Sequence, residues 1–321
     1  EVLSNLKFDN DNLKTYLILC DKMINLEKKN KFNLTSQTIE ELLDLTLNEL
    51  LYKKYDHIIN HTISGVKNAL KKGDYEDFSI IYKFYIKSES NSQLIKNIFV
   101  SHLENETEAL LEAQSDLKKN YSNLILKIYS HYDKYITIIS NYLSDSHEYQ
   151  SLLCSNIRNI FDKQKENNSM CYYLVLFISN TLISSKIDDK SKTLHLDTSI
   201  IIFKNVSDKD LFLEYYKIYL SNRLLSNNFD IDLEKSFQSK IKFICGGAYT
   251  SKLETMIKDY TLFDEYKDEF NLKLNNIGVS SDKFKWFNTR ILTQGIWPII
   301  RKTNIILPHD MRQVTEYFYK F

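Results

Sequence analysis

The chain has 321 residues with 42 basic against 42 acidic side chains, so its net charge at pH 7 is zero. This balance argues against a nucleic-acid partner, because phosphate binding draws on clustered lysine and arginine. The length predicts two or three domains, and the absence of a run of about 18 apolar residues argues against a transmembrane span or a membrane partner.

Both prolines, Pro298 and Pro308, lie close to the end of the sequence. Nothing before them forbids helix propagation, so we expect that part to be almost wholly α-helical. Apolar spacing predicts helices over 13–24, 36–72, 74–87, 92–113, 120–143 and 145–163, the second being one long helix or a broken pair that ends at Gly73. The polar joints between them are short, which favours antiparallel neighbours packed side by side.

A polar, charged stretch at 163–169 precedes an abrupt apolar helix at 172–183. We place a domain boundary in this stretch. A second polar connector, at 186–191, is predicted to be a loop between helices of the following domain.

Three amphipathic helices are predicted between 207 and 260. Ser207 with Asp210 is typical of the start of the first helix, and Gly246–Gly247 is typical of the end of the second. Ser251 and Glu254 then predict a capping box for the third. Packed against the helix at 172–183, their apolar stripes predict a small helical bundle.

Past Gly278 the apolar period changes to short runs of β-branched and aromatic residues, which predict strands at 287–293 and 303–307. Pro308 is expected to open a final helix. The residues sharing one face of that helix are Met311, Val314, Phe318 and Phe321. Two strands and one helix do not make a stable sheet domain, so we interpret this part as the start of an α/β domain.

No catalytic or metal-binding motif stands out. His57 and His61 share a helical face but lack a third ligand, and Gly246–Gly247 before Thr250 has the wrong residue order for a phosphate loop. No Ser-His-Asp, Cys-His or paired-carboxylate arrangement is evident. We therefore predict no catalytic residue, no metal and no cofactor.

The cysteines are scattered at spacings that fit neither a zinc knuckle nor a redox pair, so we expect reduced core residues. They are Cys20, Cys154, Cys171 and Cys245. A signal peptide is not evident, and the first residue is Glu1, so we expect a fragment of a longer protein of the cytoplasm and nucleus.

Two large side chains admit both a structural and a partner-binding role. Arg223 falls near the apolar stripe of its helix and needs a carboxylate or backbone partner, so an intramolecular contact is the favoured interpretation. Trp297, before Pro298, is favoured as a core anchor, with use at an interface left open.

Two blocks of residues resemble the cullin homology region in order and spacing. The first contains Lys209-Asp210, Phe212, Arg223-Leu224-Leu225, Ser239-Lys240-Ile241-Lys242, Cys245-Gly246, Tyr249-Thr250-Ser251-Lys252-Leu253-Glu254, Met256 and Lys258-Asp259. The second contains Ile291-Leu292-Thr293, Gly295-Ile296-Trp297-Pro298, Ile306-Leu307-Pro308, Asp310 and Met311. Asn222, where cullins usually carry lysine, and Asp310, where glutamate is common, depart from the pattern without changing the expected architecture.

The resemblance implies a mainly α fold: an elongated stack of five-helix cullin-type repeats, then a helical bundle, then the start of a small α/β domain. It implies the end of one helical repeat at 1–72, the last repeat at 73–166, the bundle of the homology region at 167–277 and a truncated α/β segment at 278–321. The chain would then be a middle fragment of a cullin.

By the same resemblance the protein is a non-catalytic scaffold of a cullin-RING ubiquitin ligase. It would position a substrate adaptor, bound through an amino-terminal repeat absent here, and a RING-box protein with its ubiquitin-conjugating enzyme. The RING-box contact would involve Ile291, Leu292, Thr293, Gly295, Trp297, Ile305, Ile306 and Leu307. The family-motif residues expected to be structural are Phe212, Arg223, Leu224, Leu225, Lys240, Cys245, Gly246, Thr250, Ser251, Lys252 and Leu253.

Other functions stay open at this point. A helical-rod subunit of a membrane-tethering complex would be favoured by finding only helices after Gly278. A divergent cullin-like subunit of a cell-cycle ubiquitin ligase would keep the homology region and lack some regulatory features. An enzyme is the least favoured alternative.

Overall fold

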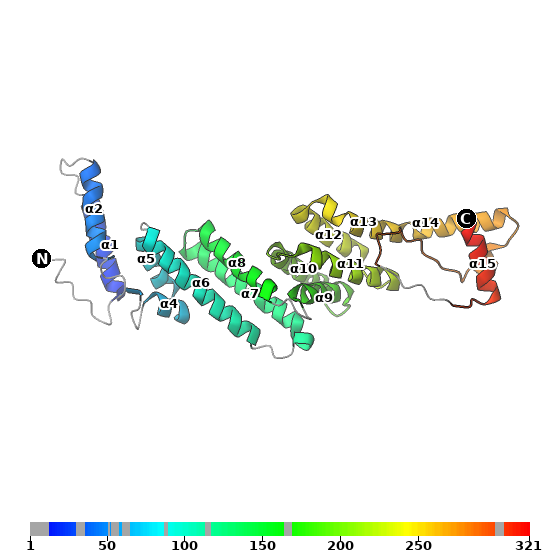
Figure 1. The fold of residues 1–321 in the computed structure, drawn as a ribbon, viewed down its shortest axis with the longest axis horizontal. Coiled ribbons are helices and arrows are strands. Elements are labelled where there is room, and N and C mark those ends of the chain that lie inside the picture. Colours follow the sequence, from blue (N-terminus) through cyan, green and yellow to red (C-terminus); the bar gives the residue numbers. More distant parts are fainter. Residues whose placement is uncertain are drawn as a thin grey trace. The chain divides into compact units, whose positions relative to one another are not determined.

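The computed structural model describes residues 13–29, 36–50, 52, 58–59, 65–86, 89–112, 117–163, 169–298 and 305–321. The chain divides into two compact units, Glu1–Lys163 and Gln164–Phe321. The described residues are mostly α-helical (Figure 1), so the predicted mainly α fold class is confirmed. The assignment of residue ranges to particular repeats stays a prediction.

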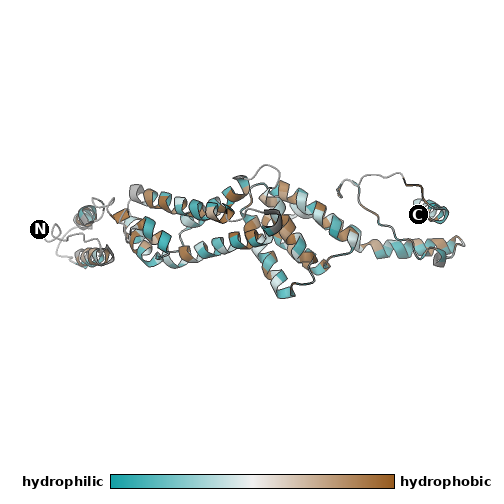
Figure 2. Ribbon diagram, turned by 90° about the horizontal axis from the view of Figure 1, so that it is seen from below, coloured by the Kyte–Doolittle hydropathy of each residue, from teal (hydrophilic) through white to brown (hydrophobic). Residues whose placement is uncertain are grey.

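The first unit contains helices that largely match the predicted ones. They are α1 Leu13–Lys29, α2 Ser36–Leu50, α4 Val66–Lys72, α5 Tyr75–Tyr85, α6 Glu89–Glu112, α7 Leu117–Tyr142 and α8 His147–Lys163. Most of them carry both hydrophobic and hydrophilic residues along their length (Figure 2), as the amphipathic pattern requires. Of the two forms predicted for 36–72 the broken one is present, and Gly73 ends α4 in the left-handed conformation with φ 76°.

Buried aromatic rings form the centre of the first unit. Phe99 of α6 lies against Phe78 of α5, Tyr135 of α7 and Tyr149 of α8, with ring centroids 6.2, 5.8 and 5.1 Å away. All four side chains are at most 1% exposed. Burial of rings this large is worth about 1.5–3 kcal/mol each, so these contacts fix how the helices pack.

One carboxylate, that of Glu106, contacts several polar side chains of α6 and α7. Glu106 accepts hydrogen bonds from Lys134 Nζ at 3.1 Å and Tyr135 Oη at 2.9 Å, and it lies 3.5 Å from His102 Nε2 and 3.6 Å from His131 Nδ1. Burial lowers the pKa of His131 to about 4, although the charge of Glu106 partly opposes this shift. The imidazole of His131 is therefore neutral at pH 7.

The second unit begins with a helical bundle, as predicted. Its helices are α9 Met170–Ile183, α10 Asp189–Lys204, α11 Lys209–Ser226, α12 Ile231–Cys245 and α13 Gly247–Thr261. The N-caps of α10, α11 and α12 are Asp188, Asp208 and Asp230, whose carboxylates each accept a backbone N–H of the first turn. The start of α11 is thus capped by Asp208 rather than by the predicted pair of Ser207 and Asp210.

Aromatic contacts also line the core of the bundle. Phe212 of α11 lies 4.6 Å from Phe203 of α10 between ring centroids, and Tyr216 lies 5.7 Å from Phe237 of α12. All four are at most 1% exposed. Of the apolar stripe that the sequence predicts for α11, Phe212, Tyr216 and Leu220 are buried, whereas Tyr215 and Tyr219 are partly buried.

A single glycine joins α12 to α13. Gly246 has φ 85° and ψ 167°, a conformation that residues with a Cβ adopt only with strain. The predicted capping box is wrong, because α13 already begins at Gly247, four residues before Ser251. The Ser251 hydroxyl donates to Ala248 O at 3.0 Å, and Glu254 instead accepts from Thr250 at 2.7 Å.

The rest of the second unit has a small core of its own. Its helices are α14 Phe263–Asn276, the 3-10 helix η2 Ser281–Phe284 and α15 His309–Tyr319. Phe270 and Leu274 of α14 pack with Phe284 of η2 and Val314 of α15. Of the face predicted for the last helix, Val314 is fully buried, whereas Met311 is 41% exposed.

The predicted strands are not present in the described part of 278–321. Residues 287–293 and 305–307 have irregular backbone, while 299–304 lie outside the described residues. A β-strand needs a neighbouring strand for its backbone groups, and the Thr293 N–H is instead bound by the Asp259 carboxylate at 2.8 Å. The small α/β domain is therefore unconfirmed.

We predict that the first unit loses stability as the pH falls from about 6.5 to about 4, because the unfolded chain then protonates His131 more readily than the folded chain does. The slope for one such histidine is about 1.4 kcal/mol per pH unit. His131→Gln should flatten this slope in urea unfolding of the chain followed at several pH values. If the free energy of unfolding had the same pH dependence in the variant and the wild type, His131 would not be the source of this slope.

Gly246→Ala should lower the free energy of unfolding by about 1–3 kcal/mol, since alanine resists this φ and ψ. Gly247→Ala is the matched control: its Cβ would meet only the flexible Lys242 Cε at 3.4 Å, and alanine favours the helix. We expect that variant to be as stable as the wild type or more so in urea unfolding. Equal losses in both variants would contradict the role of the Gly246 conformation.

Candidate partner-binding site

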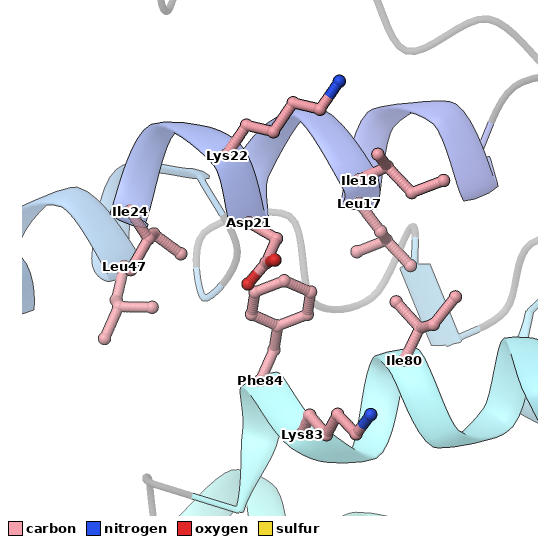
Figure 3. Close-up of a pocket in the computed structure, with 9 residues that line it drawn as sticks. All are labelled: Leu17, Ile18, Asp21, Lys22, Ile24, Leu47, Ile80, Lys83 and Phe84. Atoms are coloured by element: carbon pink, nitrogen blue, oxygen red, sulfur yellow. The ribbon is translucent and has the colours of Figure 1, made fainter. Parts of the chain in front are cut away.

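One cavity of the first unit does not have the character of a catalytic site. It has a volume of about 380 Å³, lies between α1, α2 and α5 (Figure 3) and is lined mainly by apolar side chains such as Leu17, Leu47 and Phe84. Its carboxylate, Asp21, accepts a hydrogen bond from Asn25 at 3.1 Å, and Lys22 points away from the cavity. No pair of acid and base converges there.

Among the described residues, no group of three or more His, Cys, Asp or Glu side chains is placed to hold a metal ion. His57 and His61, considered above as a ligand pair, lie outside the described residues. Among the described helices, none combines the length and the apolar character that a membrane span requires.

The first of the residues predicted to contact a RING-box partner lie in the segment 291–297, which is bound to α13. The Asp259 carboxylate of α13 accepts hydrogen bonds from Thr293 N at 2.8 Å, Thr293 Oγ1 at 2.8 Å and Trp297 Nε1 at 2.7 Å. Between them the backbone turns, with Ile296 N donating to Thr293 O at 3.2 Å. Both ends of this turn are therefore fixed by one side chain.

A second anchor lies just before that turn. The Arg290 guanidinium donates to the carbonyl oxygen of Leu224 and to Asn227 Oδ1, both at the end of α11. It also lies 5.1 Å from the ring centroid of Tyr260 and 5.7 Å from that of Phe263. A cation at a helix C-terminus interacts favourably with the carbonyl groups that the helix leaves unpaired.

Exposure separates the predicted contact residues into two groups. Trp297 is 8% exposed, which agrees with its role as a core anchor, and Leu292 and Leu307 are partly buried. Thr293 and Gly295 are exposed, although the hydroxyl of Thr293 is bound to Asp259. Ile291, Ile305 and Ile306 are 42%, 69% and 90% exposed, so they present apolar surface to solvent.

Helix α15 holds the chain on the far side of Ile305 and Ile306. Phe318 of α15 contacts Phe270 of α14, with ring centroids 5.3 Å apart. Lys273 of α14 donates to the carbonyl oxygens of Lys320 and Phe321 at 3.0 and 3.1 Å. The stretch that contains the two isoleucines thus leads into a packed helix.

Within the bundle, Arg223 makes the intramolecular contact favoured from the sequence. It is 1% exposed, and its guanidinium donates to both oxygens of Glu234 at 2.9–3.2 Å and to Ser179 Oγ at 2.9 Å. The Tyr216 hydroxyl donates to the same carboxylate. Burial and the charge of Glu234 together raise the pKa of Tyr216 well above its usual range, so that hydroxyl stays protonated.

The other family-motif residues are divided between core and surface. Phe212, Leu224, Thr250 and Leu253 are fully buried. Leu225, Ser251 and Lys252 are exposed, while Lys240 forms an ion pair with Asp197 of α10. Cys245 is partly buried and unpaired, and Gly246 makes the joint described above. The buried motif residues therefore have a structural role, which is to pack the core of the bundle.

Sequence reasoning assigned no role to three residues that organise this unit: Glu234, Arg290 and Asp259, the last of which was quoted only as part of the first block. Glu234 lies three and seven residues before Phe237 and Ile241, so its place on the buried face could have been found from the helical period. Asp259 follows the buried Met256 by three residues, which also places it at the edge of a buried face. Arg290 has no comparable signal, because its partners come from distant parts of the sequence.

Arg223→Met should lower the free energy of unfolding by about 3–5 kcal/mol, because it leaves the Glu234 carboxylate buried without its cation. Adding Glu234→Met should recover a large part of this loss, which a double-mutant cycle in urea measures. Lys242→Met, in the exposed pair with Glu254, is the control and should cost less than about 1 kcal/mol. Additive losses from Arg223 and Glu234 would contradict the coupling.

Comparison with known proteins agrees with the two sequence blocks. A family model described as the cullin alpha solenoid domain matches residues 1–267. Cullin-1 of Oryza sativa subsp. japonica is 26% identical over 313 residues, which cover 90% of this chain and 41% of that protein. Cullin-2 of Arabidopsis thaliana is 26% identical over 324 residues, or 94% and 43%. Cullin-3 of Schizosaccharomyces pombe is 27% identical over 301 residues, or 88% and 38%.

The chain therefore spans about two fifths of the length of these curated relatives. The family model covers all of the first unit and the second unit as far as α14. On this match the chain belongs to the cullin family.

Proposed function

We propose that this chain is part of a non-catalytic scaffold subunit of a cullin-RING ubiquitin ligase. The match of the cullin solenoid model to residues 1–267 carries the proposal. The packed helices support it, because a scaffold contributes fixed proximity while the chemistry takes place on other proteins. The cytoplasm and nucleus are the proposed place of action.

The proposed partner of the second unit is a RING-box protein, which would bring a ubiquitin-conjugating enzyme. Strand addition suits the stretch at 305–307, where two exposed isoleucines lie on backbone without regular structure. The turn from Thr293 to Trp297 is less suited to it, since Asp259 already binds one of its backbone N–H groups. Ile291 is exposed and can extend the apolar contact.

A substrate adaptor is the second proposed partner. The family resemblance implies that the adaptor binds an amino-terminal repeat. We assign none of the described helices to that repeat. Nucleic acid and membrane are not proposed as partners of this chain.

A helical-rod subunit of a membrane-tethering complex is the competing function. It is favoured by the lack of a β-strand among the described residues after Gly278. The family match over most of the chain weighs more, because it includes the buried motif residues of the bundle.

Ile306→Asp should reduce capture of the RING-box protein by about tenfold or more, because it places a charge in the apolar contact. Phe243→Asp is the matched control, since Phe243 of α12 is 91% exposed and Ile306 is 90% exposed. The measurement is co-purification of the RING-box protein with the complete gene product that contains this chain, in its wild-type and variant forms. Failure of the wild-type protein to retain any RING-box protein would reject the proposed function.

A further inference from the structure

We propose that the first unit carries a docking groove for an acidic, amphipathic helix of a partner protein. The groove lies between α4 and α6, which pack against each other, and has a volume of about 480 Å³. It involves only the first unit, whereas the proposed RING-box contact lies in the second unit. The two proposals are therefore independent.

The floor of this α4–α6 groove is apolar. Ile59 and Leu70 line it and are at most 4% exposed, and Ile98 is partly buried against the same core. Leu94 of α6 also lines the groove and is 44% exposed, so it offers apolar surface to a partner. Covering such surface favours binding by about 25 cal/mol per Å² removed from water.

The rim of the groove is positively charged. Lys67 and Lys71 are exposed and lie four residues apart, so both belong to one face of α4. None of the described lining residues is acidic, and the stretch 60–64, outside the described residues, contains no acidic residue either. Charge complementarity therefore favours a partner segment that carries carboxylates. Three polar residues of α6 can donate hydrogen bonds to them: Asn97, Ser101 and Asn105.

The acidic residues of α6 closest to this stretch do not line the groove. Glu106 instead accepts hydrogen bonds from Lys134 and Tyr135 of α7. Burial lowers the pKa of His102, the charge of Glu106 opposes this shift, and the positive charges of Lys134 and Lys71 add to it. The charge of Lys71 on α4 thus reaches a lining residue of α6.

The shape of the groove suits a helix. Its lining residues on α6 recur every three or four positions from Leu94 to Asn105, and a helix of that length rises about 16 Å. An amphipathic helix laid along a groove presents apolar anchors at i, i+3 or i+4, and i+7. Carboxylates beside those anchors can then meet Lys67 and Lys71.

A synthetic probe tests the groove on the complete gene product that contains this chain. The probe is a fluorescent helical peptide of about 15 residues, with leucines along one face and glutamates beside them, and its matched control has lysine in place of every glutamate. In fluorescence anisotropy the acidic probe should bind about tenfold more tightly than the basic one, with a dissociation constant that rises with salt. Equal binding of the two probes, or binding of neither, would overturn the proposal.

Charge reversal locates the contact. With Lys67→Glu and Lys71→Glu together, the dissociation constant of the acidic probe should rise about tenfold or more, and the basic probe should become the tighter ligand. Lys190→Glu with Lys235→Glu changes the net charge equally at exposed lysines of the second unit and should leave both constants within about twofold of wild type. Equal effects of the two double variants would mean that net charge alone attracts the probe, and would contradict a defined groove.

The apolar part of the contact has its own variant. Leu94→Ser should weaken binding of the acidic probe about fivefold, and the exposure of Leu94 means that the fold should tolerate the change. Leu194→Ser in α10 is the matched control, since Leu194 is 60% exposed. Binding that is insensitive to Leu94→Ser would reject the apolar floor as part of the site.

A second copy of the chain is the alternative occupant. Helix α2 is acidic, contains no basic residue, and exposes Leu42 and Leu45 by 41% and 61%. In sedimentation without a probe, we expect the wild type and the variant with Lys67→Glu and Lys71→Glu to have the same mass. Self-association of the wild type that this variant abolishes would assign the groove to a second copy and overturn the proposed partner.

Discussion

The ion pair between Arg223 and Glu234 determines how the bundle of the second unit can pack. Both side chains are almost completely buried, and the guanidinium also reaches Ser179, so helices α9, α11 and α12 meet at one polar centre. Burying two charges costs several kcal/mol per ion, which close contact and further hydrogen bonds must offset. Only a packing that keeps these contacts together avoids an unpaired buried charge.

This constraint extends along α11 and α13 to the surface. Arg223 and Leu224 lie in the last turns of α11, and the Leu224 carbonyl accepts a hydrogen bond from Arg290. Asp259 of α13 holds Thr293 and Trp297 in the same way. The irregular segment after η2 therefore takes its shape from the helices beneath it. A segment without regular structure of its own can still present a defined surface when side chains of a rigid core bind its backbone.

Much of the fold follows from the sequence because its helices obey local rules. The amphipathic pattern predicted three helices between 207 and 260, and Gly246–Gly247 marked the end of α12. The start of α13 was predicted too late, because Ser251 and Glu254 match the pattern of a capping box, whereas the helix begins at Gly247. The site was less predictable: the partners of Arg290 lie more than sixty residues earlier in the chain, and no local pattern encodes such a contact. The predicted strands show the same limit, since a strand depends on a neighbour as well as on its own β-branched residues.

A scaffold places particular demands on its polar groups. At the starts of α10, α11 and α12, an aspartate accepts a hydrogen bond from a backbone N–H of the first turn. In the core of the bundle, the buried guanidinium and carboxylate are each other's hydrogen-bond partners. Such a network leaves few alternative packings of similar energy, and a bundle with one packing keeps its surface groups at constant separation. In the proposed ligase the reacting groups belong to other proteins, so the separation that the bundle maintains sets their effective concentration. In that proposal the buried charge pair contributes to function by fixing the geometry of the bundle.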